Sequence, residues 1–238
     1  HAGGVEPVAR IPEPPFWGAR VVEHVQLDEI FPFVNHNALF RGQWGFKQGD
    51  LETKAYEALL ENEARPALAR LQKQAKDEGD AFLQPKVVYG WFPCAAEGQD
   101  LVVYDPTDPA RELERFTFPR QRSGRGLCIS DFFRGDGTRD VVGFTCVTMG
   151  PNASARAKRL FDSNAYTEYL YTHGFGVECA EALAELWHKR MRAELGIGLE
   201  DSAKIRELFQ QKYRGCRYSF GYPACPDMAD QEKLWRLL

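Results

Sequence analysis

An arginine, a glycine and a tyrosine lie close together in the segment RYSFGYPACPD, residues 217–227. Arg217 offers a planar fork of donors that suits a carboxylate, and Gly221 allows a ligand to approach the main chain. Tyr222 can stack on a flat ring or donate its hydroxyl. These properties suit a small zwitterion that carries an aromatic base. The alternative is a plain turn, in which Arg217 pairs with a helix terminus or a surface acid and Tyr222 packs on a sheet.

The same segment is predicted to be a loop of defined shape. Each of its two prolines fixes φ and removes a backbone donor, while its glycine tolerates a positive φ. Such a composition is typical of a turn-rich connection between regular elements. We therefore take this loop as the best candidate for a binding site.

Other residue types that do chemistry form no recognisable catalytic set. The chain has no Gly-rich phosphate loop, HExxH, GxSxG or kinase signature. Its six cysteines include no CxxC pair, and its five histidines form no close pair. We expect no zinc or iron site built by this chain alone, and free thiols rather than disulfides. A cysteine nucleophile activated by a histidine stays open, because such residues need only meet in the fold.

Composition and charge narrow the class of protein. Of 238 residues, 44% are hydrophobic, which is enough for a packed core in one large domain or two small ones. The 30 basic and 34 acidic residues argue against general binding to the phosphate backbone of nucleic acids. The sequence has no apolar run of about 18 residues and no secretion signal at its start. We expect a globular cytoplasmic protein, with neither nucleic acid nor membrane as a partner.

The first 15 residues, HAGGVEPVARIPEPP, differ in composition from the rest. They contain four prolines and two glycines and few apolar side chains. This favours an interdomain linker over 1–15, in a chain cut from a longer protein, and one domain over 16–238. The aromatic-rich residues 16–46 are predicted to be irregular structure, ending in a short helical pattern, that packs on the core.

A helix and then a series of strands are predicted next. Asp50 is the predicted N-cap of a helix over 51–79, which Pro66 should kink or divide. The β-rich runs that follow are residues 86–94, 100–106, 115–120, 127–133 and 140–150. The first two runs are predicted to pair as a hairpin through a longer loop, AAEGQ.

The last third of the chain is predicted to be mostly helical. Residues 155–196 carry a helical pattern that Gly174 and Gly176 weaken in the middle, and residues 202–215 and 229–238 are further helices. Because the helices stand before and after the strands rather than between each pair, we predict an α+β fold. We expect a twisted antiparallel sheet flanked by helices.

The sequence around this loop also matches a known pattern. GYPACPD is followed closely by EKLW and preceded by R-x-x-x-GY and the helix AEALAELWHKRMR. This combination resembles the C-terminal activation (reactivation) domain of cobalamin-dependent methionine synthase, and PFWGARVV and ALFRGQWGF upstream are similar to its N-terminal part. The resemblance covers roughly residues 14–238. It implies a domain that binds S-adenosylmethionine, which remethylates cobalamin after oxidation to cob(II)alamin, with an electron from a flavodoxin or an equivalent reductase.

The resemblance also implies roles for individual residues. Arg217, Gly221 and Tyr222 match a ligand-binding arginine, glycine and tyrosine of the family, and Arg217 would clamp the methionine carboxylate. Ser219 falls where a main-chain contact to the ligand is expected. Glu181 matches an acidic residue that the family uses toward the amino or ribose hydroxyl groups of the ligand.

Helical spacing alone favours a different interpretation of Glu181. In a helix it shares one face with Glu178, Glu185, Lys189 and Arg192, which is the pattern of a solvated polar stripe. A polar face can also line a groove, so the spacing does not decide between the two interpretations.

This chain departs from the family at three places. Asn35 aligns with an acidic position near the sulfonium and amino group, where an amide keeps an acceptor and loses a charge. Met228 stands where the family commonly has a histidine. The chain stops at Leu238, whereas the family usually runs on for several dozen residues that include a further ligand-contacting tyrosine. We expect the C-terminal end to be truncated and part of the groove to lie outside this sequence.

We interpret the chain as the S-adenosylmethionine-binding reactivation module of methionine synthase, the 5-methyltetrahydrofolate–homocysteine methyltransferase. The resemblance implies that a neighbouring domain of the same polypeptide holds cobalamin, and that zinc belongs only to another domain. The module has no catalytic residue of its own and presents its ligand in an open groove. The alternatives are a stand-alone S-adenosylmethionine- or corrinoid-interacting protein without turnover, and a flavin- or thiol-dependent enzyme.

Overall fold

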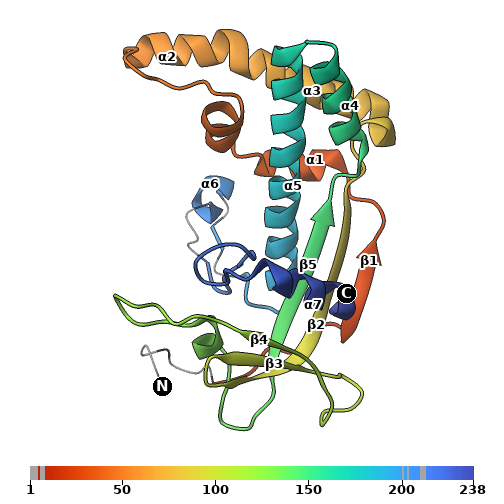
Figure 1. The fold of residues 1–238 in the computed structure, drawn as a ribbon, viewed down its shortest axis with the longest axis vertical. Helices are drawn as coiled ribbons and strands as arrows, with labels where there is room; N and C mark the ends of the chain where they lie inside the picture. The colour runs from red at the N-terminus through yellow and green to blue at the C-terminus, as the bar shows by residue number, and fades with distance from the viewer. Residues whose placement is uncertain (1–4, 6–8, 200, 203, 210–212) are drawn as a thin grey trace. The chain divides into compact units, whose positions relative to one another are not determined.

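The computed structural model describes residues 5, 9–199, 201–202, 204–209 and 213–238 (Figure 1). The chain forms two compact units. Unit 1 comprises His1–Val21, Val88–Thr145 and His188–Leu238, and unit 2 comprises Val22–Val87 and Cys146–Trp187. Residues 1–4 and 6–8 of the predicted linker lie outside the described residues, and residues 9–15 form no helix or strand. Within the described part of the chain, no helix is long and apolar enough to cross a membrane.

Five strands form one sheet. They are β1 (Gly18–Val22), β2 (Lys86–Glu97), β3 (Asp100–Tyr104), β4 (Glu112–Thr117) and β5 (Asp140–Thr148). The order is β1-β2-β3-β4, and β5 pairs with β2. Strand β3 runs antiparallel to both β2 and β4. The central strand β2 is buried along most of its length, which accounts for its nearly continuous apolar sequence. The predicted α+β class is confirmed.

The hairpin of β2 and β3 is confirmed, but its predicted loop AAEGQ is wrong. Glu97 pairs directly with Asp100, so the turn contains only Gly98 and Gln99. Gly98 has a φ of 66°, a conformation that glycine adopts without strain. Ala95 is buried and pairs with Val102, because small apolar residues extend the central strand as well as larger ones do.

The strand predicted at 127–133 is also wrong. Ile129–Phe132 form a 3-10 turn, since the Asp131 carboxylate accepts the backbone N–H of Cys128 at 2.8 Å and so closes the turn. The region 16–46, predicted as irregular, contains β1, the short helix α1 (Leu27–Ile30) and a π-helical turn at Ala38–Gln43.

The long helices include α2 (Thr53–Leu59), α3 (Arg65–Glu78), α4 (Asn152–Asp162) and α5 (Tyr166–Glu194). Asp50 is not the N-cap of the first of them. It lies inside a turn closed by Leu51 N–H and the Gln48 carbonyl, and the helix begins at Thr53. The division at Pro66 is confirmed, because a π-helical turn precedes it and separates α2 from α3.

Helix α5 is continuous for 29 residues, so the weakening predicted at its two glycines is wrong. A Cβ at Gly174 would lie 2.7 Å from Cβ of Gln43 and 2.9 Å from the Trp44 ring. The glycine therefore serves close packing within unit 2, and the burial gained there outweighs its low helix propensity.

The C-terminal part contains α6 (Ile205–Leu208), a 3-10 turn at Met228–Asp230 and α7 (Gln231–Leu237), which confirms the last predicted helix. The helix predicted over 202–215 is too long. Residues 203 and 210–212 lie outside the described residues, and residues 213–215 are not helical. Figure 1 shows α7 beside β4, where Lys233 Nζ donates to the Arg115 carbonyl at 2.7 Å.

Candidate functional site

The loop between residues 217 and 227 has the defined shape that its sequence predicts. Gly221 N–H donates to the Cys225 carbonyl and Cys225 N–H donates to the Tyr222 carbonyl, each at 2.9 Å. Gly221 has a φ of 92°, which is in the region that favours glycine. Two backbone bonds thus close a compact turn over residues 221–225, which contains Pro223, and the predicted loop of defined shape is confirmed.

Two apolar side chains anchor the loop to unit 1. The Phe220 ring lies 5.9 Å from the Phe116 ring of β4 at an interplanar angle of 20°, and Cys225 is buried in the same core cluster. The Cys225 thiol donates to the Ser219 carbonyl at 2.9 Å. Ser219, Gly221 and Tyr222, three predicted ligand contacts, are exposed.

Large apolar and aromatic side chains are exposed around this turn. Tyr222 is 66% exposed and Met228 55% exposed, and Tyr218 and Trp235 are also open to solvent. Burial, followed by the charges and the hydrogen bond of the neighbouring Cys216, raises the pKa of Tyr218 to about 12, so its hydroxyl stays protonated at neutral pH. An exposed group of apolar side chains of this size is typical of a surface that meets a ligand or a partner.

Met228 lies against the turn, a contact that the sequence alone did not predict. A Cβ built on Gly221 would lie 2.7 Å from the Met228 sulfur, so the thioether covers that face of the glycine. Asp227 holds the start of the Met228 turn by accepting the N–H of Ala229 at 2.8 Å. Met228, which stands where the family commonly has a histidine, therefore lies directly against Gly221, a predicted site residue.

Arg217 is half-buried and lies near the end of α5. Burial, together with the positive charges of Arg192 and Arg217, lowers the pKa of His188 to about 4. The imidazole is therefore neutral at neutral pH, and it does not add a third positive charge to the two guanidinium groups.

The two remaining predicted residues belong to unit 2. Asn35 N–H donates to the Glu178 carboxylate at 3.1 Å. The side-chain oxygen of Asn35 accepts the N–H groups of Asn37 and Ala38 at 3.1 and 3.2 Å. A carbonyl oxygen has two acceptor sites, so a ligand amino group would compete with these N–H groups for the Asn35 oxygen.

The polar face of α5 is not the solvated stripe that its spacing allows. Glu178, Glu185 and Arg192 are 5%, 8% and 2% exposed, while Glu181 is exposed. Burial, with a smaller contribution from the negative charge of Glu181, raises the pKa of Glu178 to about 7, although the Asn35 N–H partly opposes the shift. Helical spacing places Glu178, Glu185 and Arg192 on the same face as Glu181. This spacing is the one feature of the sequence that could have pointed to these three residues.

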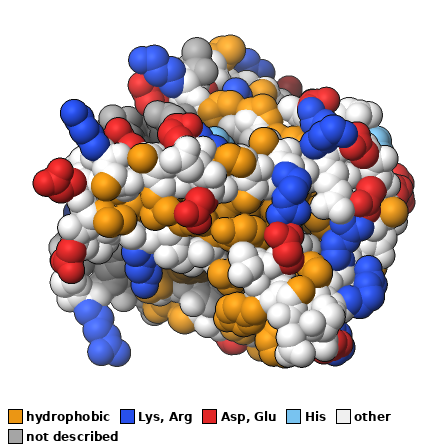
Figure 2. Space-filling view, turned by 90° about the horizontal axis from the view of Figure 1, so that it is seen from above, with side chains coloured by type: hydrophobic (Ala, Val, Ile, Leu, Met, Phe, Trp, Pro, Cys, Tyr) orange, Lys and Arg blue, Asp and Glu red, His pale blue; other side chains and the backbone are white. Residues whose placement is uncertain are grey.

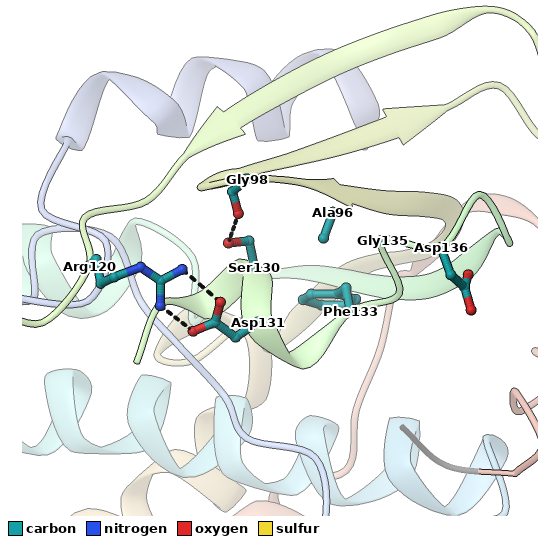
Figure 3. A pocket seen from close by; sticks show the side chains of 8 residues that line it. All are labelled: Ala96, Gly98, Arg120, Ser130, Asp131, Phe133, Gly135 and Asp136. Atoms are coloured by element: carbon teal, nitrogen blue, oxygen red, sulfur yellow. Dashed lines mark hydrogen bonds and ion pairs between the residues drawn. The ribbon is translucent and has the colours of Figure 1, made fainter. Parts of the chain in front are cut away.

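Unit 1 has a surface hollow of about 310 Å³ that Figure 3 shows from close by. Arg120 points at Asp131 and donates to both of its oxygens at 2.6 and 2.7 Å, and Ser130 donates to the Gly98 carbonyl at 2.9 Å. Asp136 lies on the other side of the hollow (Figure 3). Since these polar groups already bind one another, they shape a turn, and no predicted site residue lines this hollow.

The surface in Figure 2 shows Lys and Arg side chains interspersed with Asp and Glu, and apolar side chains between them. No strip of a single charge follows that face (Figure 2). Among the described residues, no group of three His, Cys, Asp or Glu side chains could hold a metal ion.

All six cysteines are free thiols in the structure. Four are buried, and burial raises the pKa of Cys94, Cys179 and Cys225, which leaves these thiols protonated and unreactive. The two exposed thiols are Cys146 and Cys216.

Comparison with known proteins agrees with this fold and loop. Residues 26–238 match the family described as "Vitamin B12 dependent methionine synthase, activation domain". The chain is 43% identical over 242 residues to the methionine synthase of Mycobacterium tuberculosis (strain ATCC 25618 / H37Rv). It is 40% identical over 243 residues to that of Mycobacterium leprae (strain TN). Each alignment covers 96% of this chain and 20% of the relative, so the chain spans about a fifth of these relatives.

A solved structure shares the fold. The crystal structure of the MetH reactivation domain bound to AdoHcy superposes with a TM-score of 0.81 at 23% identity, over 96% of this chain and 72% of that chain. At this identity the likeness concerns the fold alone, whereas the family match extends over most of the sequence. The chain belongs to the family of activation domains of vitamin B12-dependent methionine synthase.

Proposed function

We propose that this chain binds S-adenosylmethionine and presents its methyl group to a cobalamin held by a neighbouring domain of the same polypeptide. Family membership supports the proposal, and so does the solved relative, which holds AdoHcy, the demethylated form of the same ligand. The observation that carries it in this chain is the closed turn at Gly221. Its backbone bonds and buried anchors fix the loop while Ser219, Gly221 and Tyr222 are exposed, and the half-buried Arg217 lies four residues before Gly221 in the same loop.

Each part of this loop suits one part of the ligand. The Arg217 guanidinium can bind the methionine carboxylate with two parallel hydrogen bonds. The main chain at Ser219 can contact the ligand closely because its side chain is small, whereas at Gly221 the Met228 thioether covers one face, so a ligand would have to approach from another side. Tyr222 is exposed enough for its ring to stack on adenine. A ligand on an exposed turn leaves its methyl group accessible to a cofactor carried by another domain.

Asn35 and Glu181 remain proposed contacts to the ligand. Both lie near the buried carboxyl of Glu178 in unit 2. Negative charge from Glu181 and Glu178 would favour the sulfonium and ammonium groups of S-adenosylmethionine. A carboxyl with a pKa of about 7 would ionise fully when such a cation binds beside it, because an adjacent positive charge stabilises the carboxylate.

In this proposal the chain contributes positioning to methyl transfer. Cobalamin, when bound by its own domain, supplies the cobalt that accepts the methyl group. The residues of this chain bind the donor and orient its sulfonium, so they need no nucleophile of their own. The further partners are a flavodoxin or an equivalent reductase as the electron donor, in the cytoplasm.

Isothermal titration with S-adenosylmethionine tests the proposal. We expect Arg217→Ala to weaken binding by about 2 to 4 kcal/mol, since it removes one partner of a desolvated charge pair. Arg217→Lys keeps the charge and loses the planar fork, so it should restore only part of the affinity. Arg214→Ala, which removes a charge at an exposed position of the same segment, is the matched control. Binding by Arg217→Ala within twofold of the parent protein would refute the assignment of this loop.

A further inference from the structure

A polar cluster, buried at His188, Arg192 and Asp201, joins the end of α5 to the segment that precedes Arg217, where Tyr213 is half-buried and Gly215 is exposed. It consists of His188, Arg192, Asp201, Tyr213 and Gly215, all in unit 1. His188 and Arg192 lie one turn apart on α5, and the side chains of Arg192 and Asp201 are 3% and 6% exposed. We refer to these five residues as the α5 cluster. The sequence predictions assign them no role.

Arg192 is the centre of the α5 cluster. One of its guanidinium nitrogens donates to the carboxylate of Asp201. The guanidinium also lies over the Tyr213 ring, 4.1 Å from the ring centre. Its aliphatic stem packs against Gly215, where an added Cβ would lie 3.4 Å from Cδ of Arg192. One side chain therefore contacts the segment after α5 at three separate points.

His188 supports the same segment from the preceding turn of α5. Its ring meets the Tyr213 ring edge to face, with centres 5.1 Å apart and an interplanar angle of 67°. Gly215 has a φ of 83°, and an added Cβ would lie 3.0 Å from Ile197, so only glycine fits between α5 and this segment. The backbone at 213–215 is thereby held in one conformation.

The α5 cluster leaves buried polar atoms without hydrogen-bond partners among the described residues. They are Nε and Nη2 of Arg192, Nδ1 of His188 and Oδ2 of Asp201. A buried ion pair with unpaired atoms stabilises a fold less than well-packed apolar side chains of similar volume would. Stability alone is thus a poor reason for an arginine here. The planar, charged guanidinium of Arg192 makes contacts that an apolar side chain could not make.

The α5 cluster acts on the backbone immediately before Arg217. Two residues of extended chain span at most about 7 Å, so the anchored Gly215 restricts where the Arg217 backbone can lie. A bidentate bond to a carboxylate requires the guanidinium plane to be oriented correctly. Small movements of residues 213–215 would therefore turn the fork away from its ligand.

We propose that Arg192 is a positioning residue for Arg217, which it orients toward the carboxylate of the ligand by holding Tyr213 and Gly215. This inference rests on the proposed function. It makes a specific prediction. Loss of Arg192 should weaken the binding of ligands that carry the carboxylate and leave the affinity for ligands that lack it unchanged. A purely structural role would weaken both kinds of ligand alike.

Isothermal titration of Arg192→Met with two ligands tests this prediction. S-Adenosylmethionine carries the carboxylate, and 5′-methylthioadenosine has the adenosine and the sulfur but no carboxylate. We expect Arg192→Met to weaken S-adenosylmethionine binding about tenfold and to change 5′-methylthioadenosine binding by less than about twofold. Arg192→Lys keeps the charge and should recover part of the loss. Arg214→Met, at an exposed position, is the matched control and should bind both ligands like the parent protein.

Equal losses for the two ligands in Arg192→Met, or no loss for either, would overturn the inference and leave the proposed function standing. A parent protein that binds no S-adenosylmethionine would overturn both. If Arg192→Met does not fold, Asp201→Asn removes only the ion-pair partner, and the same selective loss is expected from it. An equal effect of Asp201→Asn on both ligands would again reject the positioning role.

Discussion

The buried carboxyl of Glu178 predicts an unusual pH dependence of stability. Its pKa is raised from an ordinary 4.5 to about 7, chiefly by burial. The carboxyl therefore binds its proton more tightly in the folded than in the unfolded chain. The free energy of unfolding is unaffected by this group below its unfolded pKa, falls as the pH rises from about 4.5 to about 7, and levels off above that range. Most carboxyl groups do the opposite, since native ion pairs usually lower their pKa.

The magnitude follows from the two pKa values. A difference of one in pKa corresponds to about 1.4 kcal/mol, so ionised Glu178 costs the folded state about 3 kcal/mol at alkaline pH. Glu178→Gln removes the ionisation and keeps an oxygen for the Asn35 N–H. We expect it to raise the free energy of unfolding by about 2 to 3 kcal/mol at about pH 8.5, and by less than about 1 kcal/mol at about pH 5.

Urea unfolding of the parent protein and Glu178→Gln at the two pH values measures this difference. The comparison between pH values cancels any effect of the amide on packing, because packing does not titrate. Glu181→Gln makes the same chemical change at an exposed position on the same helix face and should alter stability much less. An equal gain from Glu178→Gln at both pH values, or a loss at the higher one, would refute the reasoning.

Three other measurements address packing, the loop and the thiols. Gly174→Ala should destabilise the protein by about 1 to 3 kcal/mol in urea unfolding, because its Cβ would lie 2.7 Å from Gln43. Gly176→Ala is the control and should lower the free energy of unfolding less, because the nearest atom there is 3.3 Å away. Gly221→Ala requires an alanine at a φ of 92° against the Met228 thioether, and should weaken S-adenosylmethionine binding about tenfold or more in titration calorimetry. Two thiols should react with Ellman's reagent in the native protein and six after denaturation; fewer than six in denatured, freshly reduced protein would contradict the free-thiol assignment.

The local sequence predicted the structure correctly where the conformational preference of single residues decides it. The turn at Gly221 could be predicted because glycine adopts a positive φ without strain and the two prolines that follow it fix their own φ, whatever surrounds them. Pro66 divides its helix for the same kind of reason. The segment 127–133 could not be predicted correctly, since the bond from Cys128 N–H to Asp131 competes with strand formation and apolar patterning does not reveal it.

The site shows the same division between local and tertiary causes. The sequence by itself determined the loop, the arginine, glycine and tyrosine on it, and the membership of the polar face of α5, because residue spacing sets which side chains share a face. Only the tertiary structure decided that Glu178 and Arg192 are buried while Glu181 is exposed. Spacing along a helix does not specify what packs against it. The raised pKa of Glu178 and the contacts of Arg192 arise from that packing, so they depend on segments far away in the sequence.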